Sequence, residues 1–338
     1  MNDYKNLKLI ATSSPHIRTS ENTKSIMLDV IIALLPALAI GIYYFGWRAL
    51  TVTCVSVIGC IFWEWAYRKL LKKPQSVGDL SAVVTGILLV FVCPVTVSYW
   101  AVLIGDFFAI VVVKQLFGGI GKNFVNPALA ARAAMLASWT SMMATWVAPG
   151  SHAAILGGNA DIVTAATPMS YLHVNDLEGL KAAYSISDVF LGRIGGSLGE
   201  VSALMLILGG LYLLIRKVIT WQTPVAYIGT VMLLTLLFPR GNDPVEWMLY
   251  NVFSGGLILG AFFMATDYST SPVTYKGQLI FGVGCGLLTI FIRYFGSYSE
   301  GVCYSILIMN LCVSLIDRNV KPRRFGVTKS GKKEAAAK

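Results

Sequence analysis

The segment "DIVTAATPMS", residues 161–170, places two hydroxyl side chains close together in an otherwise apolar chain. Thr164 and Thr167 flank two alanines, and Pro168 directly follows the second threonine. Such a hydroxyl is either a point where a chemical group is attached or part of an ordinary turn. In a turn, the hydroxyl caps a helix and the proline presets the backbone. Taken alone, the ten residues favour the turn.

Charged side chains inside apolar runs are a second set of candidates. Asp106 and Arg132 lie within runs that could span a membrane, and Asp29 and Glu64 lie near the ends of such runs. A charge at the bilayer centre costs about 2.5–3.5 kcal/mol on insertion scales, so it marks a functional candidate. We expect Arg132 to pair with Asp106 or to contact a ligand phosphate, and we consider Asp106 for an ion pathway. Asp29 and Glu64 are expected to be solvated or paired with Lys or Arg.

Two polar loops lie beside short apolar segments. One contains Gly121-Lys122-Asn123 with Asn126, and the other contains Thr266-Asp267-Tyr268 with Ser271. Backbone and amide groups at broken helices can bind an ion or a ligand. The alternative is that Asn123, Asn126 and Asp267 only cap helices.

The composition indicates a multi-pass α-helical membrane protein. Of the 338 residues, 56% are hydrophobic and only 13% are charged, whereas soluble proteins have about 25% charged residues. The net charge of +10 is explained by basic cytoplasmic loops better than by nucleic-acid binding. The six cysteines form no CxxC pair, and the three histidines show no paired spacing, so we predict no metal site. No cleavable signal peptide and no GxGxxG nucleotide motif is recognised.

Ten apolar segments are predicted to be membrane spans. Several are short, and the third ends at Cys93-Pro94. Short or proline-interrupted spans in corresponding halves indicate discontinuous helices around a site at the membrane midplane. The expected spans are 26–45, 49–67, 80–93, 99–116, 124–138, 198–216, 223–238, 247–265, 278–294 and 301–316.

The two halves resemble each other. Pro94 and Gly118 in the first half match Pro272 and Gly296 in the second half, with the same shift along the chain in both cases. We therefore expect two five-helix repeats, and an odd number of spans in each makes the repeats inverted.

The distribution of Lys and Arg predicts the topology. With a cytoplasmic N-terminus, 21 of the 27 basic residues lie inside, five lie outside, and Arg132 lies within a span. The long loop with Thr164 and Thr167 is then on the outer side, and its length suggests a function. The expected division is a cytoplasmic N-terminal segment (1–25), two repeats (26–138 and 198–316) around the outer loop (139–197), and a basic cytoplasmic tail (317–338).

Several stretches resemble the NqrB/RnfD family. They are "SSPHIRTSENTKSIMLDVIIALLPALAIGIYYFG", "KQLFGGIGKNFVNPALAAR", "GAFFMATDYSTSPVTYKGQLIFG" and "RYFGSYSEGVCYSILIMN", and together they cover most of the chain in the expected order. The short segment before the first span is more similar to RnfD, because NqrB has a longer N-terminal extension. Thr164-Ala165-Ala166-Thr167 resembles the Ser/Thr-x-Ala-Thr motif at which flavin transferases attach FMN. In many relatives glycine stands where this chain has Ala165.

The resemblance implies a membrane flavoprotein subunit of an Rnf complex in a bacterial or archaeal plasma membrane. Such complexes couple electron transfer between reduced ferredoxin and NAD⁺ to the movement of Na⁺ or H⁺. The resemblance implies FMN joined to Thr167 through a phosphoester, with Thr164, Ala166 and Pro168 beside it. It also implies a second, non-covalent flavin (riboflavin or FMN), for which Asn123, Asn126 and Asp267 are candidates.

The implied partners are a flavin transferase and the subunits RnfA, RnfB, RnfC, RnfE and RnfG. The implied fold is a bundle similar to that of urea transporters, without a complete catalytic site in this chain. Two alternatives stay open, namely an NqrB-like subunit of a Na⁺-translocating quinone reductase and a non-redox channel of the urea or ammonium type.

Overall fold

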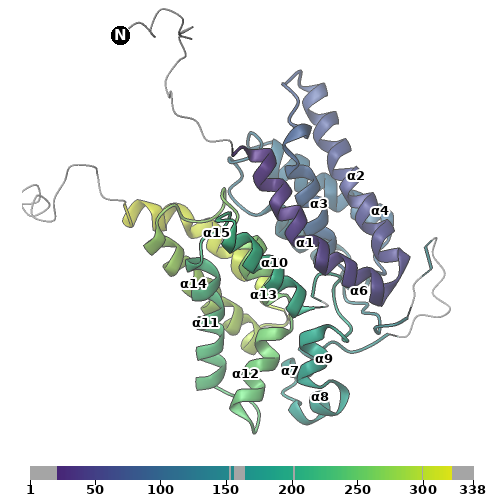
Figure 1. The fold of residues 1–338 in the computed structure, drawn as a ribbon, viewed down its shortest axis with the longest axis vertical. Helices are drawn as coiled ribbons and strands as arrows, with labels where there is room; N and C mark the ends of the chain where they lie inside the picture. Colours follow the sequence, from purple (N-terminus) through teal and green to yellow (C-terminus); the bar gives the residue numbers. More distant parts are fainter. Residues whose placement is uncertain (1–20, 152–153, 156–163, 201, 299, 322–338) are drawn as a thin grey trace, which may run out of the picture.

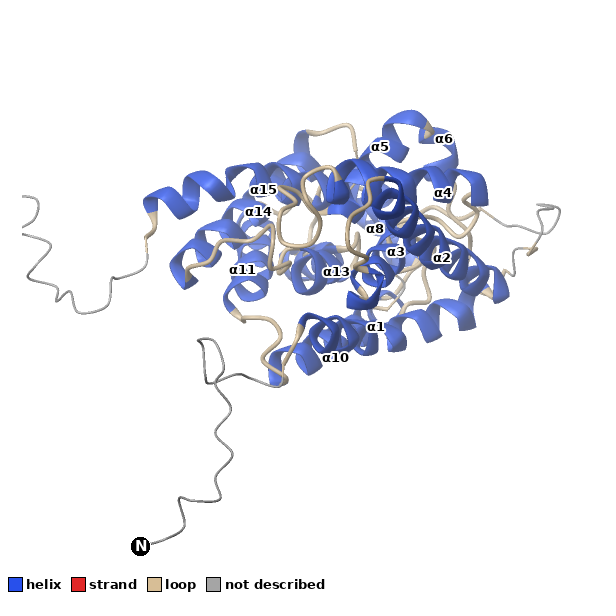
Figure 2. Cartoon of the chain, turned by 90° about the horizontal axis from the view of Figure 1, so that it is seen from above, coloured by secondary structure: helices blue, strands red, loops and turns tan. Residues whose placement is uncertain are grey.

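The computed structural model describes residues 21–151, 154–155, 164–200, 202–298 and 300–321, which form helices joined by loops (Figures 1 and 2). Among these residues, the only β contact is an antiparallel bridge between Val147 and Thr164. The predicted all-α class is confirmed for the described part of the chain. The helices in chain order are α1 (Thr23–Phe45), α2 (Trp47–Leu70), η2 (Val77–Asp79), α3 (Ser81–Phe91), α4 (Tyr99–Phe107), η3 (Phe108–Gln115), α5 (Pro127–Ser138), α6 (Thr140–Met143), α7 (Pro168–His173), α8 (Leu177–Ala183), α9 (Ile186–Leu191), α10 (Ala203–Ile215), α11 (Gln222–Leu237), α12 (Pro244–Phe253), α13 (Leu257–Leu259), η4 (Gly260–Met264), α14 (Tyr275–Phe295) and α15 (Val302–Asn319).

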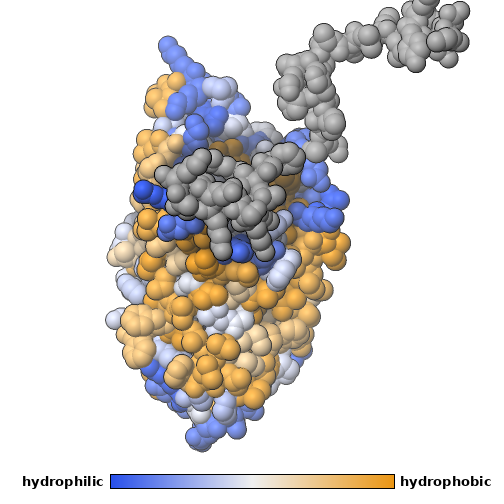
Figure 3. All heavy atoms as spheres, turned by 90° about the vertical axis from the view of Figure 1, so that its left-hand side faces the viewer, coloured by the Kyte–Doolittle hydropathy of each residue, from blue (hydrophilic) through white to orange (hydrophobic). Residues whose placement is uncertain are grey.

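Four of the described helices, α1, α2, α14 and α15, are long and apolar enough to cross a membrane. A fifth crossing results if α12 and α13–η4 count as one bent span. About 20 apolar residues are needed to span the hydrocarbon core, and α3, α10 and α11 are apolar but shorter. Figure 3 shows a mainly hydrophobic face with hydrophilic groups gathered at its two ends. By length and composition, these helices fit a multi-pass membrane protein.

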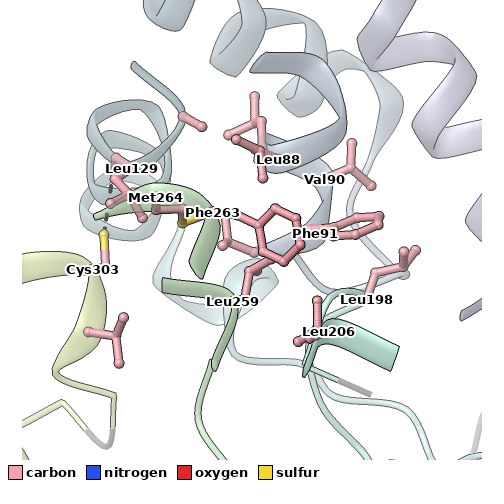
Figure 4. Close-up of a cluster of buried hydrophobic side chains, with 14 of the residues drawn as sticks. Leu88, Val90, Phe91, Leu129, Leu198, Leu206, Leu259, Phe263, Met264 and Cys303 are labelled. Atoms are coloured by element: carbon pink, nitrogen blue, oxygen red, sulfur yellow. Dashed lines mark hydrogen bonds between the residues drawn. The ribbon is translucent and has the colours of Figure 1, made fainter. Parts of the chain in front are cut away.

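The main core lies where the two halves of the chain meet. Helix α3 is apolar and almost entirely buried, and it packs against α2 and α5. Helix α5 also contacts α15, while α13 and η4 contact α10. Figure 4 shows Phe91 and Phe263 from opposite halves beside each other in this core. In the same view the Cys303 thiol donates to the Leu129 carbonyl oxygen at 3.4 Å.

Two helices end inside the bundle. Helix α3 ends at Phe91, close to the predicted break at Cys93-Pro94. The second break was not predicted: between α12 and α13 the chain bends by 60°. Gly255 and Gly256 have φ values of +73° and +66° there. Glycine suits these positions because a Cβ disfavours the left-handed region.

The described part of the long loop between α6 and α10 is folded onto α12. Helices α7, α8 and α9 form a small second core with Trp247 and Tyr250 of α12, and its other buried members include Met169, Leu172, Leu180 and Val189. The capping side chains Asp176 and Ser185 begin α8 and α9 by accepting hydrogen bonds from backbone N–H groups. Residues 164–200 are folded into short helices and turns, whereas Asp161 to Val163 lie outside the described residues.

Candidate functional site

The threonine pair lies at the start of residues 164–200, the folded part of the long loop between α6 and α10. Thr164 is exposed and bridges to Val147, and the Ala165 N–H donates to the Trp146 carbonyl oxygen at 3.2 Å. The Tyr184 hydroxyl donates to the Ala166 carbonyl oxygen at 3.0 Å. One backbone hydrogen bond and one hydrogen bond from a side chain therefore fix the segment between the two threonines against its neighbours.

Thr167 is the N-cap of α7. Its Oγ1 accepts the Ser170 N–H at 3.3 Å, and Pro168 occupies the first helical turn, where its missing N–H costs nothing. Thr167 is only 7% exposed. The turn expected from the ten residues is therefore present, and the more accessible hydroxyl is that of Thr164.

The first turn of α7 touches the break between α12 and α13. The Ser254 hydroxyl donates to the Met169 sulfur at 3.6 Å. A Cβ built on Gly255 would lie 2.7 Å from the same sulfur. The segment after Thr167 is therefore in contact with the helix break inside the bundle.

A cavity between the two halves is the second candidate site. Its empty space is about 770 Å³ when the open solvent at its mouth is included. Asn123, Asn126 and Asp267, predicted from separate loops, all line it. Apolar side chains form most of the remaining wall, among them Met27, Val84, Leu88, Leu213, Phe262 and Phe263.

The three polar side chains differ in their bonding. The Asn126 Oδ1 accepts the Ala128 and Leu129 N–H groups at 3.0 and 3.3 Å and so caps α5, as the structural alternative expected. The Asn123 amide donates to the Val125 carbonyl oxygen at 3.3 Å. Asp267 accepts the Ser269 and Thr270 hydroxyls at 2.8 and 3.2 Å within its own turn.

Lys114 lines the cavity as well, although no sequence pattern singled it out. Its Nζ donates to Glu64 Oε2 at 2.8 Å and to Ser81 Oγ at 2.6 Å, and both charged side chains are buried. The expectation that Glu64 pairs with a basic residue is confirmed. Asp29 is paired in the same way with Arg216, at 3.2 Å.

The predicted pair of Asp106 and Arg132 is wrong. Asp106 faces α2, where its Oδ1 accepts the Ser56 hydroxyl at 2.6 Å and the Cys60 thiol at 3.2 Å. Its other oxygen has no partner among the described residues. Arg132 lies on α5 and pairs with Glu300, before α15. The two helices direct the side chains to different neighbours.

The sequence comparisons extend over most of the chain. Residues 10–326 match the NQR2, RnfD, RnfE family. The chain belongs to this family. It is 49% identical over 334 residues to the D subunit of the Na(+)-translocating ferredoxin:NAD(+) oxidoreductase complex of Acetobacterium woodii, covering 98% of this chain and 99% of that protein.

Two further relatives match the chain over a similar length. The D subunit of the proton-translocating ferredoxin:NAD(+) oxidoreductase complex of Clostridium ljungdahlii is 42% identical over 325 residues, covering 93% of this chain and 95% of that protein. The D subunit of the ion-translocating oxidoreductase complex of Stutzerimonas stutzeri is 40% identical over 338 residues, with the same two coverages. Family membership therefore extends over nearly the whole chain.

Proposed function

We propose that the chain is the membrane flavoprotein subunit of an Rnf-type ferredoxin:NAD⁺ oxidoreductase and couples electron transfer to cation movement. The observation that carries this proposal is family membership over residues 10–326, together with relatives named as the D subunits of such complexes. One relative is named as part of a Na⁺-translocating complex and another as part of a proton-translocating complex. The coupled ion is therefore proposed to be Na⁺ or H⁺. Partners of the Rnf type would supply the ferredoxin and NAD⁺ sites.

Thr167 is the proposed attachment residue for FMN, which supplies one- and two-electron transfer when bound. The hydroxyl suits an ester oxygen because it accepts the Ser170 N–H and donates to no described group. Replacing its proton by a phosphoester bond therefore removes no hydrogen bond seen here. Ala165 and Ala166 add little bulk beside it.

The burial of Thr167 bears on when FMN is attached during the folding of the chain. A transferase needs access to the hydroxyl, and only 7% of Thr167 is exposed. The attachment is therefore proposed to precede the docking of residues 164–167 against Trp146 and Tyr184. Those contacts consist of a few hydrogen bonds, so the undocked segment is accessible at low cost.

The cavity is proposed to hold the second flavin. Its apolar walls suit the ring system, and Asn123, Asn126 and Asp267 offer polar groups at its edge. Lys114 is the only basic residue in the described lining, and Glu64 already neutralises it. A flavin without a phosphate is therefore favoured over FMN, because no unpaired cation in that lining would balance a phosphate.

The two-repeat architecture remains a proposal, and the helix bounds support it. When the first half is moved along the sequence so that Pro94 matches Pro272, α4 with η3 falls on residues 277–293, which lie within α14. The same move brings α5 onto residues 305–316, which lie within α15. The same shift places α1 over α10 and makes α2 overlap α11. We propose ten crossings or half-crossings in two inverted repeats, similar to the urea-transporter bundle, with the outer loop between them.

Orientation follows from the same proposal. The termini are placed in the cytoplasm and the threonine pair outside, because most Lys and Arg then lie on the inner side. Asp106 is kept as a candidate for the ion pathway, since it is buried without a cation among the described residues and one of its oxygens lacks a partner there.

The test is the intact mass of the chain from a host that has the flavin transferase, together with in-gel flavin fluorescence after denaturation. The wild type is expected to carry the mass of one FMN phosphoester. Thr167→Ala should lose both the added mass and the fluorescence, whereas Thr164→Ala should keep both. Thr167→Ser keeps a hydroxyl group to which FMN can be attached. An unmodified wild-type chain would reject the covalent flavin and favour the non-redox channel.

A further inference from the structure

Four charged side chains that the proposed function does not use are buried where the two halves meet. Arg132 of α5 and Arg293 of α14 are 7% and 4% exposed. Glu200, just before α10, is 7% exposed, and the side chain of Glu300, just before α15, is 12% exposed. Buried charges are costly unless they are paired, so the partners of each group decide its state.

The two arginines have different tasks. Arg132 donates to Glu300 and forms an ion pair with it. Arg293 instead binds backbone oxygens at the break after α12, donating to Asn251 at 2.6 Å, Ser254 at 3.2 Å and Gly255 at 3.3 Å. Its Nε has no partner among the described residues. Arg293 therefore stabilises the break, and it forms no ion pair with a described carboxylate.

Glu200 is the carboxyl group without a cation. No ion pair among the described residues includes it, and its carboxyl group hydrogen-bonds to that of Glu300. Glycine backbone encloses it on two sides, because a Cβ built on Gly256 or Gly196 would lie 2.9 or 3.4 Å from its oxygens. The side chain is therefore held against the second carboxyl group.

Two carboxylates in contact repel each other strongly at a buried site, and one of them then keeps its proton. Among the described cations only Arg132 donates to the pair. Arg293 lies near both carboxyl groups, but its hydrogen bonds go to backbone oxygens at the break. We propose that Glu200 and Glu300 form a proton-binding site in which Glu200 donates its O–H to the Glu300 carboxylate. Glu300 then accepts from Glu200 on one side and from Arg132 on the other.

The other titratable groups around the site carry no charge at neutral pH. Cys303 of α15 and Cys93 after α3 lie near Arg132, and Tyr227 of α11 and Tyr294 of α14 lie near Arg293. Thiols and phenols are neutral at neutral pH. The charged groups are thus the two arginines and the carboxyl pair, and only Arg132 forms an ion pair with a carboxylate among the described residues.

The test compares Glu200→Gln with Glu300→Gln in the full-length chain in lipid nanodiscs. Glutamine resembles a protonated glutamic acid, so Glu200→Gln should unfold at nearly the wild-type temperature. Glu300→Gln removes the carboxylate that is paired with Arg132 and should unfold at a clearly lower temperature. Equal losses in both variants, or a larger loss in Glu200→Gln, would overturn the assignment.

Infrared spectroscopy supplies the second measurement. The wild type should show a carboxylic acid C=O band that shifts in D₂O and is missing in Glu200→Gln. Asp106→Asn serves as the control that assigns the band of a second buried acid that has no ion pair among the described residues. If Glu200→Gln does not accumulate, Glu200→Asp should move the band. A band that neither Glu200 substitution changes would contradict the proposal that the two carboxyl groups share a proton. Loss of the band on addition of Na⁺ would also contradict it, because the site would then bind a cation through ionised carboxylates.

Discussion

The side chain of Asn126 joins the two halves of the chain by donating its amide to the Met264 carbonyl oxygen at 3.3 Å. The same side chain caps α5 through its oxygen. One residue therefore fixes the start of a helix in the first half and the end of η4 in the second half. Asn126 also lines the cavity proposed for the non-covalent flavin.

Asn126→Ala should reduce both stability and flavin retention. Loss of the cap costs about 0.5–2 kcal/mol, and the Met264 carbonyl oxygen loses its donor. The measurements are the thermal unfolding temperature and the amount of flavin released per chain on acid denaturation. Asn126→Asp keeps the cap but not the amide donor. If Asn126→Asp retained flavin like the wild type, the link to Met264 would be unimportant for the cavity.

Lys114→Met should destabilise the chain strongly. It leaves Glu64 buried without its cation, and breaking a buried ion pair costs about 3–5 kcal/mol. The double variant Lys114→Met with Glu64→Gln removes both charges and should recover much of the loss in a chemical unfolding experiment. Equal stability of the single and double variants would show that the pair contributes little.

Gly255→Ala should weaken the contact between α7 and the bundle. The residue has φ +73°, and the new Cβ would lie 2.7 Å from both the Arg293 Nη2 and the Met169 sulfur. We expect faster hydrogen exchange in residues 168–173 and a lower unfolding temperature. The matched control is Gly229→Ala in α11, where a Cβ meets nothing within 4 Å. Similar behaviour of the two variants would contradict the role of the break.

The attachment of α8 to the start of α12 should weaken at strongly alkaline pH. Hydrogen bonds from Lys181 to Asp243 and Glu246 raise the pKa of Lys181 above its usual value. The stabilisation is therefore complete below the pKa of a free lysine, about 10.4, and is lost as the pH rises through the raised value. Hydrogen exchange across 177–183 should increase over that range.

Lys181→Met should remove this alkaline change, because no ammonium group is left to titrate. High salt should weaken the same attachment at neutral pH, since the groups are largely exposed. An alkaline transition that persists in Lys181→Met would assign the effect to another group.

Features that depend on local sequence were predicted well. The apolar segments indicated the helical class, and the segment around Cys93-Pro94 indicated the end of α3 because proline cannot continue a helix. The expected turn at Thr167 is present, because its side chain caps α7; the attachment of FMN there stays a prediction. Asn123, Asn126 and Asp267 were chosen from separate loops and line one cavity.

Features that depend on tertiary contacts were missed. Arg132 was assigned to Asp106 because both lie in spans, but nothing in the sequence tells which face of α5 points to Glu300. Glu200 falls inside the predicted span 198–216, so the rule that selected Asp106 applies to it equally. The break between α12 and α13 has only a Gly-Gly pair as its local signal, since its stability comes from Arg293 much later in the chain.

This separation along the chain has a consequence for biosynthesis. The carbonyl groups of Ser254 and Gly255 emerge from the ribosome before α14, which carries the arginine that satisfies them. Unsatisfied backbone groups are not tolerated in lipid, so α12 and α13 cannot take their final bent form at the moment of insertion. We therefore expect the bend to reach its final form only after α14 has arrived.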